Sequence, residues 1–154
     1  MRRLVPATAI LIILLAMAGC SRPKTRERAE ERLLDYAHAV DHDYEQPEKI
    51  YPFLTASLRE RMTKEAFCDA WAKERTYPYI TPLYIWQPEI TMDPDNGGGE
   101  ATFLQAARIV GMTYTVRFVY ENGDYYIEDW EQFADGSYLD KFETVVQSID
   151  WYYD

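Results

Sequence analysis

The strongest constraint on the fold is a pair of alternating apolar and polar segments joined by Asn122-Gly123. Residues 112–121 precede this pair and residues 124–133 follow it, and both segments are rich in aromatic and β-branched residues. Asn-Gly in a two-residue loop favours a type I′ turn, whose twist matches that of two antiparallel strands. The sequence therefore predicts a β-hairpin with a fixed register.

That register decides which residues share a face of the hairpin. The face expected to line the core or a cavity carries Tyr114, Val116, Phe118, Tyr120, Tyr125 and Ile127. The same register pairs Val116 with Asp129, so Asp129 is expected on the aromatic face. The opposite face carries Thr115, Arg117, Glu128 and Trp130. Arg117 and Glu128 are expected to form a cross-strand ion pair there.

Helices are expected before the sheet. Apolar residues recur on one side of a helix at positions Ala29, Leu33, Leu34, Tyr36, Ala37, Val40 and Tyr44. A proline at position 47 ends this helix or starts the next turn. A second short helix is predicted over Pro47 to Arg61. Thr63 is suited to cap a third helix, whose Phe67, Ala70 and Trp71 form an apolar stripe.

From Tyr77 onwards prolines exclude helix, and β-branched and aromatic residues predominate. Strands are predicted near residues 83–86 and 89–92, and from about 100 to 109. After the hairpin, an apolar stripe predicts a last helix that begins near Ser137 and extends to about Tyr153. Helices, then an antiparallel sheet, then a helix indicate an α+β fold, in which N-terminal helices pack on a curved, cone-like sheet.

The N-terminus has the pattern of an export signal. Arg2 and Arg3 precede an apolar run that is shorter than the roughly 20 residues needed to cross a bilayer. The run ends in Met17-Ala18-Gly19-Cys20, which resembles the lipobox of bacterial lipoproteins, with Met17 where Leu is commoner. The resemblance implies cleavage before Cys20 and acylation of that cysteine. An ordinary secretory signal and an uncleaved helix are the alternatives.

The expected organisation is a signal peptide (1–19), a lipidated cysteine with a short stalk (20–26) and one domain (27–154). Cleavage leaves 14 basic against 26 acidic side chains, a net charge of −12. Such a charge disfavours nucleic acid and anionic lipid as direct ligands. The acyl chains would then hold the protein to the bacterial cell membrane, on its extracytoplasmic side. With Cys20 acylated, Cys68 has no partner for an intrachain disulfide.

The residues VRFVYENGDYYIEDW, which follow helices and earlier strands, resemble the last hairpin of the nuclear-transport-factor-2-like superfamily. Tyr125 and Ile127 stand where many members have Trp-x-Ile. The segment LRERMTKEAFCDAW is similar to the helical pair of exported members, and the N-terminal domain of some penicillin-binding proteins is the nearest resemblance. The resemblance to the superfamily covers roughly Glu27 to Phe133 of this chain. The C-terminal helix departs from the pattern, and it could plug the mouth of the cone or contact a second copy.

The candidate pocket lining is Tyr114, Phe118, Tyr120, Tyr125, Ile127 and Asp129. A carboxyl buried among aromatic rings has a raised pKa and can act as a general base, as the isomerases and dehydratases of the superfamily imply. We expect no cofactor, no metal site and no catalysis. His38 and His42 have metal-ligand spacing but fall on the solvent side of their helix. The carboxylates of the loop 93–99 lack the EF-hand spacing.

A non-catalytic, lipid-anchored binding or accessory domain of the cell envelope, with a protein partner, is therefore the expected function. A carrier or sensor that holds a small apolar ligand in the aromatic cavity is the alternative. An isomerase- or dehydratase-like enzyme is a further alternative, and it requires two or more ionisable groups that converge inside the cavity.

Overall fold

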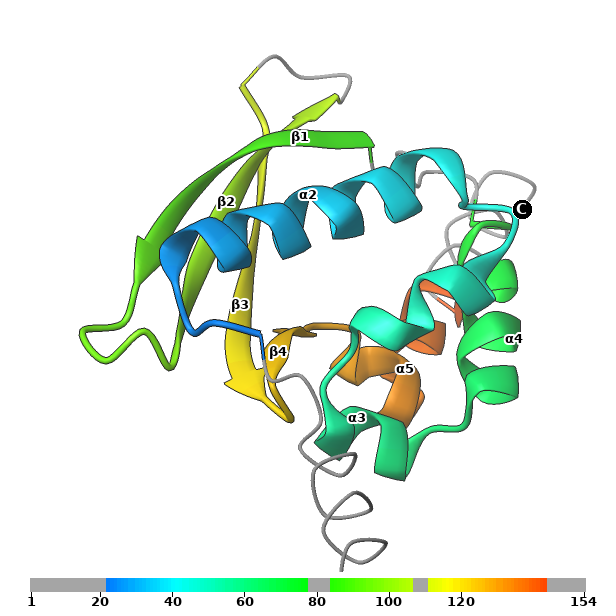
Figure 1. The fold of residues 1–154 in the computed structure, drawn as a ribbon. Coiled ribbons are helices and arrows are strands. Elements are labelled where there is room, and N and C mark those ends of the chain that lie inside the picture. Colours follow the sequence, from blue (N-terminus) through cyan, green and yellow to red (C-terminus); the bar gives the residue numbers. More distant parts are fainter. Residues whose placement is uncertain (1–21, 78–83, 107–110, 144–154) are drawn as a thin grey trace, which may run out of the picture.

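The computed structural model describes residues 22–77, 84–106 and 111–143 (Figure 1). The predicted signal peptide and Cys20 lie outside these residues, as does the predicted helix beyond residue 143. The fold is α+β, as expected, with helices on the N-terminal side packed against a four-stranded antiparallel open sheet. The helices are α2 (Arg26–His42), η1 (Pro47–Lys49), η2 (Tyr51–Phe53), α3 (Ala56–Arg61), α4 (Lys64–Glu74), α5 (Glu131–Asp135) and η3 (Ser137–Leu139). The strands are β1 (Tyr84–Met92), β2 (Gly98–Ala106), β3 (Thr113–Glu121) and β4 (Asp124–Glu128).

The predicted hairpin and its register are confirmed. Asn122 and Gly123 both have positive φ angles, 50° and 86°, as a type I′ turn requires. The predicted pairs that form are Tyr120 with Tyr125, Phe118 with Ile127, and Arg117 with Glu128. The ion pair on the outer face is also present, with 3.3 Å between Arg117 Nε and Glu128 Oε2.

The far end of the hairpin differs from the prediction. The ladder between β3 and β4 ends at Arg117–Glu128, so the predicted pairing of Val116 with Asp129 does not form in the described hairpin. Trp130 has a left-handed backbone, with φ of 68°, and α5 begins directly after it. This residue turns the chain off the sheet and inward. Trp130 was expected on the outer face and is instead buried.

The two strands predicted at 83–86 and 89–92 form one strand, β1, with a bulge between them. The pairing with β2 shifts between Trp86 and Glu89, where Gln87 has φ of 50°. A bulge absorbs one extra residue without ending the strand. Pro88 is tolerated because β1 is at the edge of the sheet.

The helix predicted over Pro47 to Arg61 is broken into η1, η2 and α3. Leu54 is extended, with φ of −76° and ψ of 151°, and forms a parallel bridge with Ile127. The Thr55 N–H donates to the Ile127 carbonyl at 3.3 Å, and the Thr55 side chain caps α3. Pairing with the edge of β4 therefore overrides helix formation in this segment.

Helices α2 and α4 begin within a residue of where they were expected, whereas α5 lies in a segment predicted as strand. Thr63 caps α4, and Phe67, Ala70 and Trp71 are buried, as predicted. The stripe on α2 contains one error, because Leu34 is exposed. Ser137 was expected to cap a long helix. It begins the short helix η3, which has no side-chain cap.

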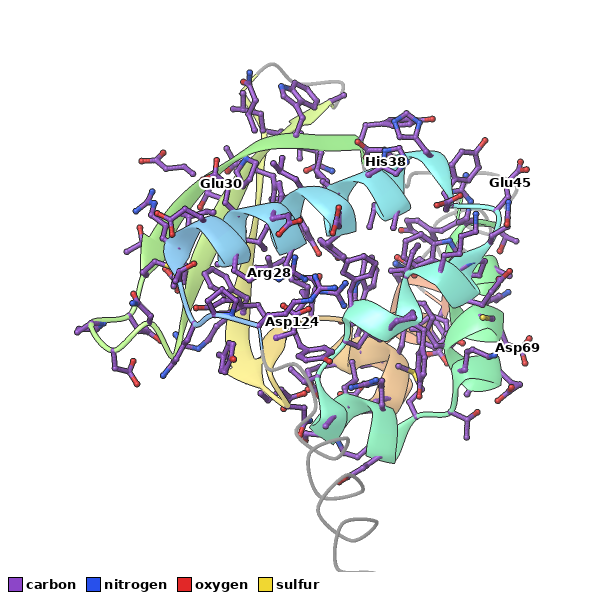
Figure 2. All side chains as sticks on the ribbon, in the orientation of Figure 1. Arg28, Glu30, His38, Glu45, Asp69 and Asp124 are labelled. Carbon is purple, nitrogen blue, oxygen red and sulfur yellow. The ribbon has the colours of Figure 1, made fainter. Side chains whose placement is uncertain are left out.

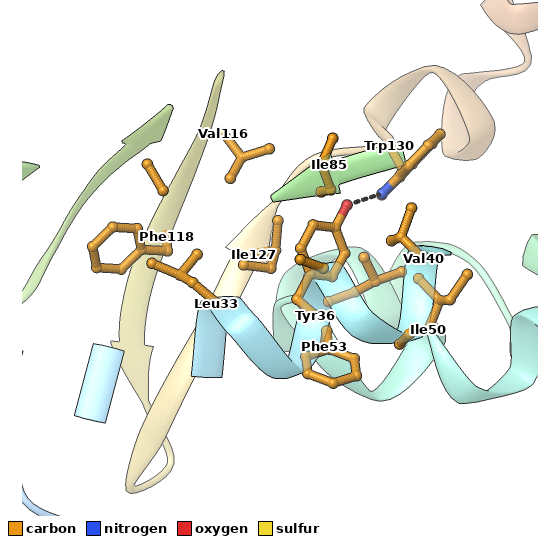
Figure 3. Packing of buried hydrophobic residues seen from close by; sticks show 14 of the residues in the cluster. Leu33, Tyr36, Val40, Ile50, Phe53, Ile85, Val116, Phe118, Ile127 and Trp130 are labelled. Carbon is orange, nitrogen blue, oxygen red and sulfur yellow. Dashed lines mark hydrogen bonds between the residues drawn. The ribbon is translucent and has the colours of Figure 1, made fainter. Parts of the chain in front are cut away.

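The core lies between α2 and the sheet and extends to α4 and α5 (Figure 3). Its side chains from α2 include Leu33, Tyr36 and Val40, and those from the sheet include Phe118 and Ile127. In the part of the chain that is described, no helix is long and apolar enough to span a bilayer.

Candidate functional site

Five of the six predicted pocket-lining residues lie on one face of the sheet, whereas Asp129 follows the end of β4, and half of the six form closed core. Phe118, Tyr125 and Ile127 each have an exposed fraction of 0%. The ring centroids of Phe118 and Tyr125 are 5.6 Å apart with the rings nearly perpendicular, which is a favourable packing of aromatic quadrupoles. These three side chains therefore stabilise the fold and do not line an open surface.

The hydroxyl groups at this end of the face bind the protein itself. Tyr125 OH donates to the Asn96 carbonyl at 2.9 Å. Tyr120 OH donates to the Arg22 carbonyl at 2.5 Å. The tyrosines here thus join the segment before α2 and the β1–β2 loop to the sheet.

At the other end of the face, Asp129 and Tyr114 join a polar network. Tyr114 OH donates to Asp129 Oδ2, and the Tyr114 and Tyr36 hydroxyl oxygens are 3.0 Å apart. Trp130 Nε1 donates to Tyr36 OH at 3.1 Å, the contact dashed in Figure 3. We call these four residues the Asp129 network.

The direction of donation in the Asp129 network follows from its two ends. The indole N–H of Trp130 can only donate, so the Tyr36 oxygen accepts there. The Asp129 carboxylate accepts the Tyr114 proton, which leaves the Tyr114 oxygen to accept from Tyr36. Asp129 Oδ1 also accepts from the Trp130 backbone N–H at 2.7 Å. The side-chain hydrogen bonds therefore all run in one direction, from Trp130 through Tyr36 and Tyr114 to the Asp129 carboxylate.

Burial controls the protonation of this network. Burial raises the pKa of Asp129, and the hydrogen bonds from Tyr114 and from the Trp130 N–H offset this only in part. Burial, and then the nearby Asp129 charge, also raise the pKa of Tyr36, while burial is the largest cause of the raised pKa of Tyr114. The tyrosines remain neutral donors, and Asp129 is a more basic acceptor than an exposed aspartate.

Sequence reasoning assigned no role to two members of this network. Tyr36 lies on the apolar stripe of α2, so helical spacing marks it only as core. Trp130 was placed on the wrong face. The available signal was chemical: a fully buried tyrosine hydroxyl needs a hydrogen-bond partner.

The other candidate ligands are bound elsewhere or exposed. His38 and His42 are exposed, as predicted, with ring centroids 4.5 Å apart. No group of three His, Cys, Asp or Glu side chains suited to a metal ion occurs in residues 22–77, 84–106 and 111–143. Burial raises the pKa of the Cys68 thiol, which disfavours its nucleophilic thiolate form.

The carboxylates of the β1–β2 loop are held by the protein's own groups. Asp95 Oδ1 accepts from the Gly97 N–H at 2.9 Å, and Asp95 Oδ2 lies 3.4 Å from Lys24 Nζ. Asp93 Oδ2 is 3.2 Å from an Arg117 guanidinium nitrogen. These contacts make the loop a structural turn.

Comparison of the chain with protein-family models, with curated proteins and with solved structures found no match. The resemblance to the nuclear-transport-factor-2-like superfamily stays a prediction from the sequence.

Proposed function

We propose that the chain is a non-catalytic, lipid-anchored binding or accessory domain of the bacterial cell envelope. The observation that carries the proposal is the closure of the aromatic face, where Phe118, Tyr125 and Ile127 are fully buried. These large apolar side chains pack the sheet against α2, so a partner has to bind to the outer surface of the domain.

The outer face of β1 and β2 offers such a surface. Tyr84, Trp86 and Leu104 are each 42% exposed, and Trp86 lies opposite Leu104 in the strand register. Ile85, between the first two, points inward and is fully buried. Exposed aromatic side chains next to aliphatic ones are typical of protein interfaces. A protein partner in the envelope fits this surface.

Photocrosslinking in intact cells tests this proposal. A photoreactive phenylalanine analogue in place of Trp86 is expected to form a discrete adduct with an envelope protein. The matched control places the same analogue at Glu30, an exposed residue of α2 (Figure 2). The same adducts at both positions, or no adduct at Trp86, would refute the proposed interaction.

The anchor is tested separately. Cys20→Ser is expected to abolish metabolic labelling with a fatty acid and to leave the protein soluble or unprocessed, because serine has no thiol to carry the lipid. Processed Cys20→Ser protein that stays on the membrane would refute the lipid anchor while leaving the interaction untouched.

A second candidate, the binding of a small apolar ligand, is favoured by the Asp129 network. It brings Asp129, Tyr114 and Tyr36 together on the inner side of the sheet, and an isomerase- or dehydratase-like reaction would use the same groups. A ligand with a carbonyl group would compete for the Tyr114 proton. Titration with small cyclic ketones, followed by NMR, should shift the Tyr114 and Asp129 signals first. Shifts spread evenly over the protein would refute this candidate.

A further inference from the structure

Two arginine side chains lie near the ring of Tyr126 on β4. Arg32 comes from α2 and Arg59 from α3. The guanidinium carbon Cζ of Arg32 is 5.6 Å from the centroid of the Tyr126 ring, and that of Arg59 is 5.1 Å from it. Three elements that are distant in sequence thus place two positive charges around one aromatic ring.

Neither member of the pair holds a carboxylate, in contrast to three other arginines of the described residues. Arg28, Arg61 and Arg117 each form ion pairs with aspartate or glutamate. In the described ranges, no carboxylate lies within ion-pair distance of Arg32 or Arg59. Twenty-six acidic residues against 16 basic ones would supply partners readily if the pair served only as a surface salt bridge.

The hydrogen bonds that the two side chains form within the protein do not use all of their N–H donors. Arg32 donates from Nε to the Tyr125 carbonyl at 3.2 Å and from Nη2 to the Pro52 carbonyl at 3.1 Å. These bonds fix its position, and its ring contact with Phe53, at 4.0 Å, fixes it further. The Nε atom of Arg59 is buried and has no hydrogen-bond partner among the described groups.

The site is accessible and preorganised. Arg32, Arg59 and Tyr126 are all half-buried, so the guanidinium groups are partly desolvated but reachable. Partial desolvation strengthens attraction to an anion, and burial lowers the pKa of Arg32 for the same reason. The planar fork of a guanidinium group binds carboxylate and phosphate oxygens in pairs.

We propose that Arg32 and Arg59, with Tyr126, form a binding site for an oxyanion, the shared chemistry of a carboxylate and a phosphate group. Neither arginine forms an ion pair within the described residues, and an incoming oxyanion would supply that partner and accept from Arg59. Two sources fit this chemistry, a soluble anion and a lipid headgroup. The backbone between Cys20 and α2 bonds to the hairpin turn, with Arg22 N–H donating to the Gly123 carbonyl at 2.9 Å. Tyr126 follows that turn by three residues, or about 10 Å of strand.

The test uses the full chain in a non-ionic detergent, and NMR detection of the arginine Nε–Hε groups. Inorganic phosphate is the first probe, and it is expected to shift the Arg32 and Arg59 signals in a saturable way. Arg59→Gln keeps much of the side-chain stem and is expected to weaken binding about tenfold, because it removes a charged donor. Arg75→Gln is the matched control, since Arg75 also lies over a tyrosine ring, 4.2 Å from the centroid of Tyr44.

Micelles doped with phosphatidylglycerol, compared with phosphatidylcholine, distinguish the two sources. If the NMR shifts saturate with phosphatidylglycerol and this binding is lost in Arg59→Gln, the ligand is a lipid headgroup. If the shifts saturate with inorganic phosphate and not with the lipid, the ligand is a soluble anion. Equal phosphate binding by wild type, Arg59→Gln and Arg75→Gln would overturn the proposal. So would the absence of any Arg59 shift with both probes. Neither outcome depends on the anchor at Cys20 or on the proposed protein partner.

Discussion

Replacement of Asp124 by alanine is expected to be among the most destabilising changes at the surface of this fold. Arg28 is only 6% exposed and donates in a fork to Asp124, from Nε to Oδ1 at 2.8 Å and from Nη2 to Oδ2 at 2.7 Å (Figure 2). Without Asp124, a buried guanidinium group loses two charged hydrogen bonds. Removal of one partner of a buried ion pair typically costs 3–5 kcal/mol.

The structure places the expected cost at the lower end of that range, about 3 kcal/mol. Arg28 keeps a second partner, Glu31, at 2.5 Å, and the Asp124 side chain is 17% exposed, so water can replace part of what is lost. For a domain of this size, such a cost lowers the melting temperature by about 10 °C. Urea denaturation at pH 7 and calorimetry measure both quantities.

Two controls make this measurement specific to the pair. Glu31→Ala removes the other carboxylate on Arg28, but this side chain is 65% exposed, so the expected loss is below about 1 kcal/mol. The double variant Arg28→Met with Asp124→Leu removes both charges, and it should recover most of the stability lost in Asp124→Ala. A double variant no more stable than Asp124→Ala would show that packing, not an unpaired charge, explains the loss.

The pH dependence gives an independent check. Burial would raise the pKa of Asp124, but the hydrogen bonds from Arg28 and from the Tyr125 N–H outweigh it, and the pKa is lowered. A carboxyl with a lowered pKa contributes stability above its unfolded pKa, near 3.9, and loses that contribution as pH falls through its folded pKa. The gap in stability between wild type and Asp124→Asn should therefore shrink below about pH 4. A gap that stays constant under acid conditions would refute this account.

Three further changes test the packing of the sheet and the Asp129 network by urea denaturation. Gly99→Ala should cost about 1–3 kcal/mol, because the added Cβ would overlap a backbone carbonyl of β1, whereas Gly97→Ala meets only a loop carboxylate that can turn away and should cost less. Tyr36→Phe should cost about 1–3 kcal/mol, since it leaves the buried indole N–H of Trp130 without an acceptor. The pKa of Asp129 is raised, whereas that of Asp124 is lowered, so the two residues change stability with pH in opposite directions. The stability of the wild type is expected to fall as pH rises from about 3.9 through the folded pKa of Asp129. Asp129→Asn should gain stability relative to the wild type over that interval. Equal costs for the two glycine variants, no loss in Tyr36→Phe, or a pH-independent difference for Asp129→Asn would contradict these expectations.

The hairpin could be predicted from the sequence because its information is local. Asn122 and Gly123 tolerate positive φ angles, and that turn alone fixes which residues pair along β3 and β4. The inner aromatic face follows from the register by alternation. The cap at Thr63 was likewise a local signal.

The missed features depend on tertiary contacts. Gln87 and Trp130 adopt positive φ angles although neither residue type favours them, so no sequence pattern indicates the bulge or the end of β4. Leu54 is extended because an edge of β4 is available to pair with it. The Asp129 network combines α2, β3 and the residues after β4, and spacing along one element cannot show that their hydroxyl groups meet.

Asp124 and Asp129 lie five residues apart, yet their environments shift their pKa values in opposite directions. Asp124 receives its hydrogen bonds from a guanidinium cation, whereas the donors to Asp129 are a neutral hydroxyl and a backbone N–H. On acidification Asp129 is therefore protonated first, while the ion pair that joins α2 to the hairpin turn still holds. A proton on Asp129 removes its charge and makes its carboxyl group a poorer acceptor, so the bond donated by Tyr114 weakens while the fold persists. The affinity of any ligand that competes for the Tyr114 proton would thus change with pH as Asp129 titrates. Because that titration precedes the loss of the Arg28–Asp124 ion pair, the change in affinity can be distinguished from acid unfolding.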